Sequence, residues 1–235
     1  MNLLALDTST EQMSIAVQCR GQTAPWLHTA AGGALTSTHL IPQIQALMGQ
    51  AQLRFDELDA VVFGAGPGSF TGLRTACSVA QGLAFGAGLL VLPVDSLLAV
   101  AEEARVQLNA ADGFRVTALL DARMDEMYVA SYIFYSGEWI NDRGYSLIKP
   151  ENLILDDSHV LAGNVFAAYG TRLAGGSAPR VNALPTAAAL LRLAPALLAA
   201  GAAVAPQHAL PTYIRDKVAQ TTQERAALKS AAVPP

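Results

Sequence analysis

The sequence predicts an α/β protein made of two related halves, and three observations indicate this. Short apolar runs alternate with stretches of helical periodicity, each half opens on successive strand-like runs, and the first run of each half ends in an aspartate. Asp7 is followed by Met, Ile and Ala at offsets six, eight and nine, and Asp121 by Met, Val and Ala at the same offsets. Alternating strands and helices are typical of α/β domains, and the shared pattern indicates an internal duplication.

The first half contains eight predicted elements in the order βββαβαβα. A meander of three strands comes first, and single strands then alternate with helices. The strands are expected at residues 2–7, 13–19, 23–29, 60–63 and 89–94. The helices are expected at residues 40–48, 73–86 and 96–106. The fourth strand is wholly apolar, as expected of a strand that is covered on both faces.

The second half begins in the same way as the first. Strands are expected at residues 115–120, 127–135 and 138–146, and a helix at 186–200 after short mixed segments. A polar stretch at 107–113 separates the halves. We therefore expect one lobe at residues 1–106, which carries the glycine-rich loop and the partner interface, and a second at 107–218. Residues 219–235 lack periodicity and are expected to be a flexible tail.

Composition excludes several classes of protein. Hydrophobic residues make up 52% of the chain and charged residues 14%, which is the reverse of a disordered sequence. Two cysteines exclude a disulfide framework and fit a cytoplasmic protein. The net charge of −4 does not suit a protein that binds nucleic acid alone. The apolar stretch at 187–205 is interrupted by Arg192 and Pro195, so we expect no contact with a membrane.

A glycine-rich loop between a buried strand and a helix carries the clearest chemical signal. It runs from Gly64 to Arg74 and reads Gly-Ala-Gly-Pro-Gly-Ser-Phe-Thr-Gly-Leu-Arg. The free amides of a helix N-terminus attract anions, so a nucleotide or anion site is one interpretation. The residues that would form it are Asp7, Thr8, Ser9, Ser69 and Thr71. The alternative is a tightly packed, capped turn, because the loop has neither the ending of a P-loop nor the position of a Rossmann fingerprint.

Three kinds of active site find little support in the sequence, and we expect no catalytic residue. The turn at residues 121–124 has no glycine and a bulky arginine, which argues against the second phosphate loop of a kinase. No two histidines have the spacing of a helical metal-ligand pair, so no metal site is expected. Ser69 does not lie in a Gly-x-Ser-x-Gly elbow, which argues against a hydrolase.

Two helices of the first half either cover the sheet or bind a partner. The first has an apolar stripe, and the second is apolar yet slim because it is rich in alanine and glycine. Slim helices can pack closely against a matching pair from a related protein. The residues expected at such an interface are Leu40, Ile44, Leu47, Met48, Arg74, Ala76, Val79, Ala80 and Leu83. From the residues alone, both alternatives stay open.

Five segments of the chain resemble the TsaB (YeaZ) family. The most specific are Gly-Pro-Gly-Ser-Phe-Thr-Gly-Leu-Arg at 66–74 and Asp-Ala-Arg-Met-Asp-Glu-Met-Tyr at 121–128. Leu-Asp-Thr-Ser-Thr at 6–10, Leu-Ile-Pro at 40–42 and Pro-Thr-Tyr-Ile-Arg at 211–215 agree in order. The resemblance therefore covers nearly the whole chain.

The resemblance implies an ASKHA fold (actin-like ATPase, sugar kinase, Hsp70) with two RNase-H-like lobes. It also implies a non-catalytic partner of TsaD, which binds through the helices of the first lobe, and a homodimer when TsaD is absent. With the ATPase TsaE, these proteins transfer threonylcarbamoyl from threonylcarbamoyl-AMP to N6 of the adenosine beside the anticodon in tRNAs reading ANN codons. TsaC makes the adenylate. ATP and a metal ion are expected in the partner subunits and no cofactor in this chain, which meets tRNA through the complex.

One histidine bears on the assignment. The catalytic paralogue binds its metal through a His-x-x-x-His pair on the first-lobe helix, whereas this chain has only His39 there, as expected of a scaffold. Many members of the family have a histidine where Thr36 stands, and we assign neither residue a role. The alternatives are a stand-alone ASKHA-type ATPase and, with less support, a glycoprotease-like peptidase.

Overall fold

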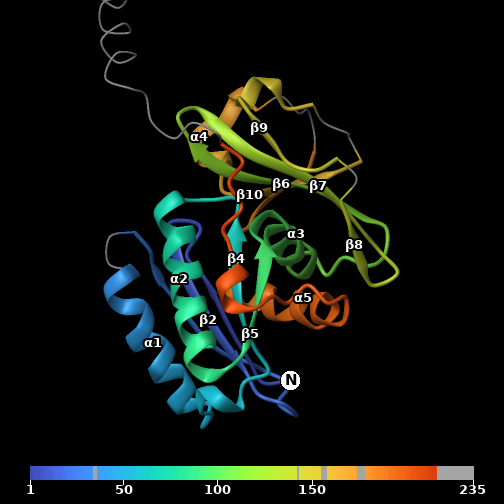
Figure 1. Ribbon diagram of the computed structural model, residues 1–235. Helices are drawn as coiled ribbons and strands as arrows, with labels where there is room; N and C mark the ends of the chain where they lie inside the picture. Colours follow the sequence, from blue (N-terminus) through green and yellow to red (C-terminus); the bar gives the residue numbers. More distant parts are fainter. Residues whose placement is uncertain (34–35, 142, 155–157, 174–177, 216–235) are drawn as a thin grey trace, which may run out of the picture.

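The computed structural model of the protein contains two mixed sheets, one from each half of the chain (Figure 1). The structure describes residues 1–33, 36–141, 143–154, 158–173 and 178–215. The expected tail at 219–235 lies outside the described residues.

The first sheet contains five strands in the order β3-β2-β1-β4-β5. Its strands are β1 (Leu3–Asp7), β2 (Gln12–Gln18), β3 (Trp26–Ala31), β4 (Ala60–Gly66) and β5 (Leu90–Asp95). The meander β1–β2–β3 is antiparallel, and β4 and β5 join it in parallel to β1. This arrangement places the carboxyl ends of β1 and β4 side by side. Along the chain, the elements of the first half follow the order βββαβαβα that the sequence predicts.

Helices cover both faces of the first sheet. α1 (Thr36–Gln50) and α2 (Phe70–Ala87) pack on one face, and α5 (Ala187–Ala199) packs on the other (Figure 1). Successive residues of β1 point alternately to the two faces, so Leu4 joins the core under α1 while Ala5 joins the core under α5. Small residues on the α5 side allow this alanine-rich helix to pack close to the sheet.

The second sheet repeats the topology of the first. Its main strands follow the order β11-β10-β6-β7-β8, with β9 also paired to β7. Its elements are β6 (Phe114–Arg123), β7 (Glu126–Tyr135), β8 (Glu138–Ile140), β9 (Ser146–Ile148), β10 (Val160–Gly163), α4 (Phe166–Tyr169) and β11 (Arg180–Asn182). Single turns of 3-10 helix lie at Phe55–Glu57, Pro150–Asn152, Gly170–Arg172 and Pro206–His208. The repeated strand order confirms the expected fold class.

The two halves exchange their last helices. α3 (Ser96–Gln107) follows the first sheet in the chain but packs on β6 and β7, whereas α5 follows the second sheet and packs on the first. Glu102 of α3 joins the two helices, because it accepts hydrogen bonds at 2.9 Å from Arg105 and from Arg192 of α5. The division of the chain between residues 106 and 107 stays a prediction.

Three expected elements differ in detail. The third strand occupies Trp26–Ala31, somewhat later than 23–29. The strand expected at 138–146 is two short strands, because the Asn141 side chain accepts hydrogen bonds from the amides of Arg143 and Gly144 and turns the chain. The 3-10 turn Pro150–Asn152 stands where the first half has α1. Of the described helices, none combines the length and apolarity that a bilayer span requires.

Candidate functional site

The glycine-rich loop packs directly against the turn that follows β1. A β-carbon on Gly64 would lie 1.8 Å from Oδ2 of Asp7, and one on Gly72 would lie 1.8 Å from the carbonyl oxygen of Thr8. These distances are far below any van der Waals contact. The loop therefore needs glycine at these positions because the β1–β2 turn, and not a ligand, fills the space beside it.

Hydrogen bonds also join the glycine-rich loop to the β1–β2 turn. The amide of Ser69 donates to the carbonyl of Ser9 at 2.7 Å, and the hydroxyl of Thr8 donates to the carbonyl of Gly72 at 2.7 Å. The side chain of Ser69 caps α2 by accepting from the amide of Gly72. The local geometry is thus that of the packed and capped turn, the second interpretation of the loop.

The five residues of the candidate anion site do not converge on one pocket. Asp7 and Thr8 are buried beneath the loop. Ser9 and Ser69 line the cleft between the two sheets, whereas Thr71 lines a different groove beside α1. The five residues therefore stay a prediction as an anion site, with Ser9 and Ser69 at the cleft and the β1–β2 turn packed beside the glycine-rich loop.

Asp7 is a fully buried acid of the first half. Its Oδ1 accepts hydrogen bonds from the amide and hydroxyl of Ser9 at 2.9 and 2.8 Å. Its Oδ2 is buried and has no hydrogen-bond partner among the described residues. Burial raises the pKa of this carboxyl to about 6, and the bonds from Ser9 oppose the rise only in part.

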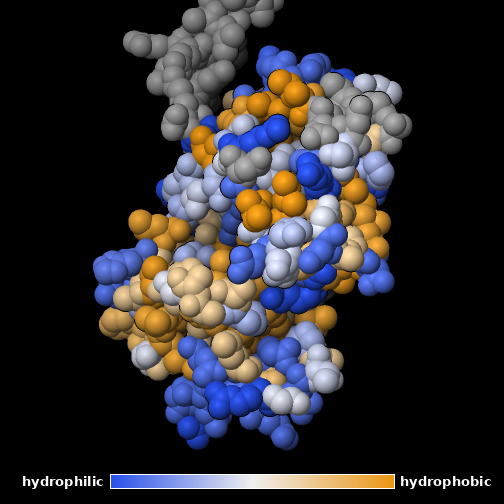
Figure 2. All heavy atoms as spheres, turned by 90° about the vertical axis from the view of Figure 1, so that its right-hand side faces the viewer, coloured by the Kyte–Doolittle hydropathy of each residue, from blue (hydrophilic) through white to orange (hydrophobic). Residues whose placement is uncertain are grey.

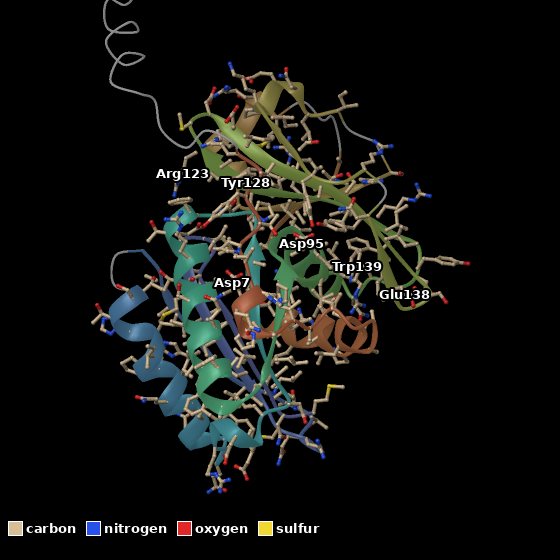
Figure 3. The ribbon with its side chains drawn as sticks, viewed as in Figure 1. Asp7, Asp95, Arg123, Tyr128, Glu138 and Trp139 are labelled. Carbon is tan, nitrogen blue, oxygen red and sulfur yellow. The ribbon has the colours of Figure 1, made fainter. Side chains whose placement is uncertain are left out.

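A cleft of about 490 Å³ lies between the sheets, at the carboxyl ends of β1 and β4. Arg123 and Tyr128 face it from the second sheet, while Asp7 lies lower, within the first sheet (Figure 3). Phe70 and Tyr213 add two further aromatic rings to the lining. A cleft of this size is sufficient for a small molecule.

Two arginines of the cleft lining form ion pairs, whereas Glu11 accepts hydrogen bonds from the side-chain amide of Asn164. Arg123 forms an ion pair with Asp121 at 3.0 Å, and Arg215 forms one with Glu126 at 2.6 Å. Arg123 belongs to a tight turn whose central residues Arg123, Met124 and Asp125 all have positive φ, at 61°, 54° and 63°. This turn offers no glycine and its arginine is engaged, so the cleft lacks a second phosphate loop among the described residues.

The nine expected interface residues fall into two groups. Leu40, Ile44, Leu47, Met48, Ala76 and Ala80 are buried against the first sheet. Val79 and Leu83 are half-buried, and only Arg74 is exposed. Six of the nine are therefore core residues of this chain and cannot touch a partner, because the apolar stripe of each helix faces the sheet.

The outward face of the helix pair consists of other residues. α2 exposes Ser78, Gly82 and Gly86 along one stripe, and Phe85 beside them is 79% exposed. Side chains added at Gly82 or Gly86 would meet open space. We name Ser78, Gly82, Phe85 and Gly86 the α2 outer face. The nine expected interface residues do not include these four, although the glycines of this helix were part of the reason to expect close packing with a partner.

The opposite side of the first sheet is covered by α5. Figure 2 shows the side of the molecule that carries α5 and β8, where apolar patches are separate and charged residues lie between them. Ala196 is exposed on α5 and offers a comparison position far from α2.

Two further positions from the sequence have structural places. His39 is exposed on α1, and Thr36 is buried at its first turn. Within the described ranges, no three side chains of His, Cys, Asp or Glu converge as metal ligands.

Comparisons with known proteins agree with one another. Residues 33–223 match the family model described as TsaD: tRNA N6-adenosine threonylcarbamoyltransferase. The chain is 34% identical, over 93% of its length, to the tRNA threonylcarbamoyladenosine biosynthesis protein TsaB of Haemophilus influenzae, of which it covers 95%. The protein of the same name from Escherichia coli is 32% identical over 93% of this chain and 96% of its own length. YeaZ from Pseudomonas aeruginosa superposes with a TM-score of 0.82 and 35% identity, over 91% of this chain and 99% of that one.

Proposed function

The chain belongs to the TsaB (YeaZ) family of tRNA threonylcarbamoyladenosine biosynthesis proteins, and we propose that it is the non-catalytic subunit of a TsaD-containing complex. The complex transfers threonylcarbamoyl from threonylcarbamoyl-AMP to N6 of the adenosine beside the anticodon in tRNAs reading ANN codons. This chain binds and activates TsaD, and the transfer takes place in TsaD.

The α2 outer face is the observation that carries the proposal. Each glycine inside a helix costs about 0.5–1 kcal/mol relative to alanine, and nothing in this chain packs on Gly82 or Gly86. Bare backbone flanked by an exposed phenylalanine allows a second helix to approach closely. The pair α1 and α2 thus supplies the partner interface, through its outward face rather than through its apolar stripes.

Two groups at the cleft already have partners within this chain. The amide of Ser69 is bonded to Ser9, and Arg123 forms an ion pair with Asp121. A phosphate that used either group would first have to break that contact. ATP and its metal ion are proposed to bind in the partner subunits.

The further partners follow from the same proposal. TsaE docks on the heterodimer with TsaD, TsaC supplies the adenylate, and tRNA is held by the complex as a whole. When TsaD is absent, two copies of this chain bind through the same helix faces.

Size-exclusion chromatography with light scattering tests the proposal. The chain is run alone, with TsaD of its own organism and as a matched pair of variants, Gly82→Arg and Ala196→Arg. We expect a one-to-one complex with TsaD from the wild type and from Ala196→Arg, and separate elution of Gly82→Arg. The added arginine at position 82 meets open space, so the variant keeps its fold.

Two outcomes contradict the proposal. Separate elution of the wild type and TsaD under all nucleotide conditions removes the partner assignment. ATP turnover by the purified chain, lost in Asp7→Asn, assigns it instead to a stand-alone ATPase of the same fold.

A further inference from the structure

Residues 209–215 run from the first sheet to the second across the mouth of the cleft. On the side of the first sheet, the main chain of this segment forms hydrogen bonds with β4 and α2. The amide of Thr212 donates to the carbonyl of Ala65 at 2.7 Å, at the end of β4. The side-chain amide of Gln81 and the thiol of Cys77, both on α2, donate to the carbonyl of Ala209 at 3.0 and 3.4 Å.

Tyr213, the residue after Thr212, packs against the start of α2. The rings of Tyr213 and Phe70 lie 5.4 Å apart between centroids. The guanidinium of Arg74 lies 3.8 Å from the centre of the Phe70 ring and donates through Nε to the hydroxyl of Tyr213 at 3.0 Å. Three exposed side chains thereby hold one another in fixed positions.

The end of the segment is anchored on the second sheet. Ile214 packs against the apolar core between α3 and β6. Arg215 donates to Glu126 at 2.6 Å and to the carbonyl of Arg123 at 3.3 Å, and its side chain is only 14% exposed. An ion pair that is this well covered is screened less than a surface pair. Seven consecutive residues thus join α2 to the β6–β7 turn.

The segment lies beside the place where ligands bind in related architectures. In open α/β sheets, ligands bind in the crevice outside the carboxyl ends of parallel strands. Here the carbonyl of Thr212 lies 2.7 Å from the place of a Gly66 β-carbon, and Gly66 has a φ of +113°. The last residue of β4 must therefore be glycine for the segment to lie there.

We propose that residues 209–215 are an inter-sheet clasp, an internal segment that lines the cleft and holds the two sheets at one fixed separation. The Glu102 network is a second link, because Glu102 of α3 accepts hydrogen bonds from Arg192 of α5 at 2.9 Å and from Trp139 of β8 at 3.2 Å. Links at two places restrain the opening of the cleft. The inference rests on contacts within this chain and does not depend on the partner interface.

Hydrogen exchange followed by mass spectrometry tests the clasp on the full chain. Tyr213→Ala/Arg215→Ala removes the ring contact and the ion pair. Tyr135→Ala/Arg20→Ala removes an exposed tyrosine and an exposed arginine as the matched control. We expect exchange in residues 209–215 and in the β6–β7 turn to accelerate by about tenfold or more in the first variant only, while α1 and β2 keep their protection.

A second variant separates the two anchors. Glu126→Gln weakens only the contact on the second sheet, so residues 213–215 exchange faster while the amide of Thr212 stays protected. Unchanged exchange at 209–215 in both variants overturns the clasp. Acceleration spread evenly over both sheets overturns it as well, because the segment would then contribute to general stability and not to the link between the sheets.

Discussion

Asp7→Asn removes a carboxyl group that the first sheet buries completely at the end of β1. The folded-state pKa of about 6 lies above the ordinary value of 3.8, so the unfolded chain loses its proton first as the pH rises. The free energy of unfolding therefore falls between about pH 4 and pH 6 and remains lower at neutral pH. The difference between the two pKa values corresponds to ~3 kcal/mol, since each pKa unit is worth about 1.4 kcal/mol.

The asparagine variant does not have this dependence. Its Oδ1 still accepts the hydrogen bonds from Ser9, but its amide nitrogen replaces Oδ2 and finds no acceptor, which costs about 1–3 kcal/mol at every pH. Going from pH 4 to pH 7, the stability of Asp7→Asn relative to wild type is expected to improve by about 2 kcal/mol, because the unfolded-state carboxyl is already partly ionised at pH 4. Other acids contribute equally to both proteins and cancel in the difference.

Urea unfolding at several pH values, followed by circular dichroism, measures the effect. Asp112→Asn removes an exposed carboxylate and serves as the control. If the stability difference between wild type and Asp7→Asn is the same at pH 4 and pH 7, the carboxyl ionises at its ordinary pKa and our account of its burial is refuted.

Four further substitutions test the packing. Gly64→Ala places a β-carbon against Oδ2 of Asp7 and is expected to lower the free energy of unfolding in urea by more than ~3 kcal/mol. Gly82→Ala places its β-carbon in open space and is expected to raise the free energy of unfolding by about 0.5–1 kcal/mol. Equal effects would contradict the close approach at Gly64. Glu102→Ala leaves Arg105 and Arg192 without their shared carboxylate. We expect the free energy of unfolding to fall by about 3 kcal/mol and the fluorescence emission of Trp139 to shift to the red. Unchanged emission would argue against the network. Leu47→Arg places a charge in the first core, so far-UV circular dichroism should show unfolding; a folded Leu47→Arg that fails to bind TsaD would restore Leu47 to the interface.

The order of strands and helices along the first half was predictable because its signals are local. The wholly apolar run at Ala60–Phe63 and the stripe at Leu40–Met48 each report burial against one sheet, and the structure places them there. The repeat beginning at Asp7 and Asp121 predicted the second sheet in the same way. The exchange of α3 and α5 was not predictable, because an apolar helix face does not identify the sheet that it covers.

The site was harder to predict for a related reason. A glycine-rich loop has the same sequence requirements whether a phosphate or the chain's own backbone approaches it, and only the position of the Thr8 carbonyl beside Gly72 distinguishes the two. Likewise, an apolar stripe such as Leu40–Met48 suits both a core and an interface, and its burial decides between them. The Pro-Thr-Tyr-Ile-Arg segment was noticed only as a resemblance, since its contacts at Ala65 and Glu126 are distant in sequence.

The affinity for TsaD tests the central claim most directly. Titration calorimetry with the wild type, Gly82→Arg and Ala196→Arg compares the α2 outer face with an exposed position on the other side of the same sheet. We predict that Gly82→Arg weakens binding by about a hundredfold or more while Ala196→Arg binds as the wild type does. Equal affinity of all three proteins for TsaD would contradict the assignment of α2 as the surface through which this chain acts.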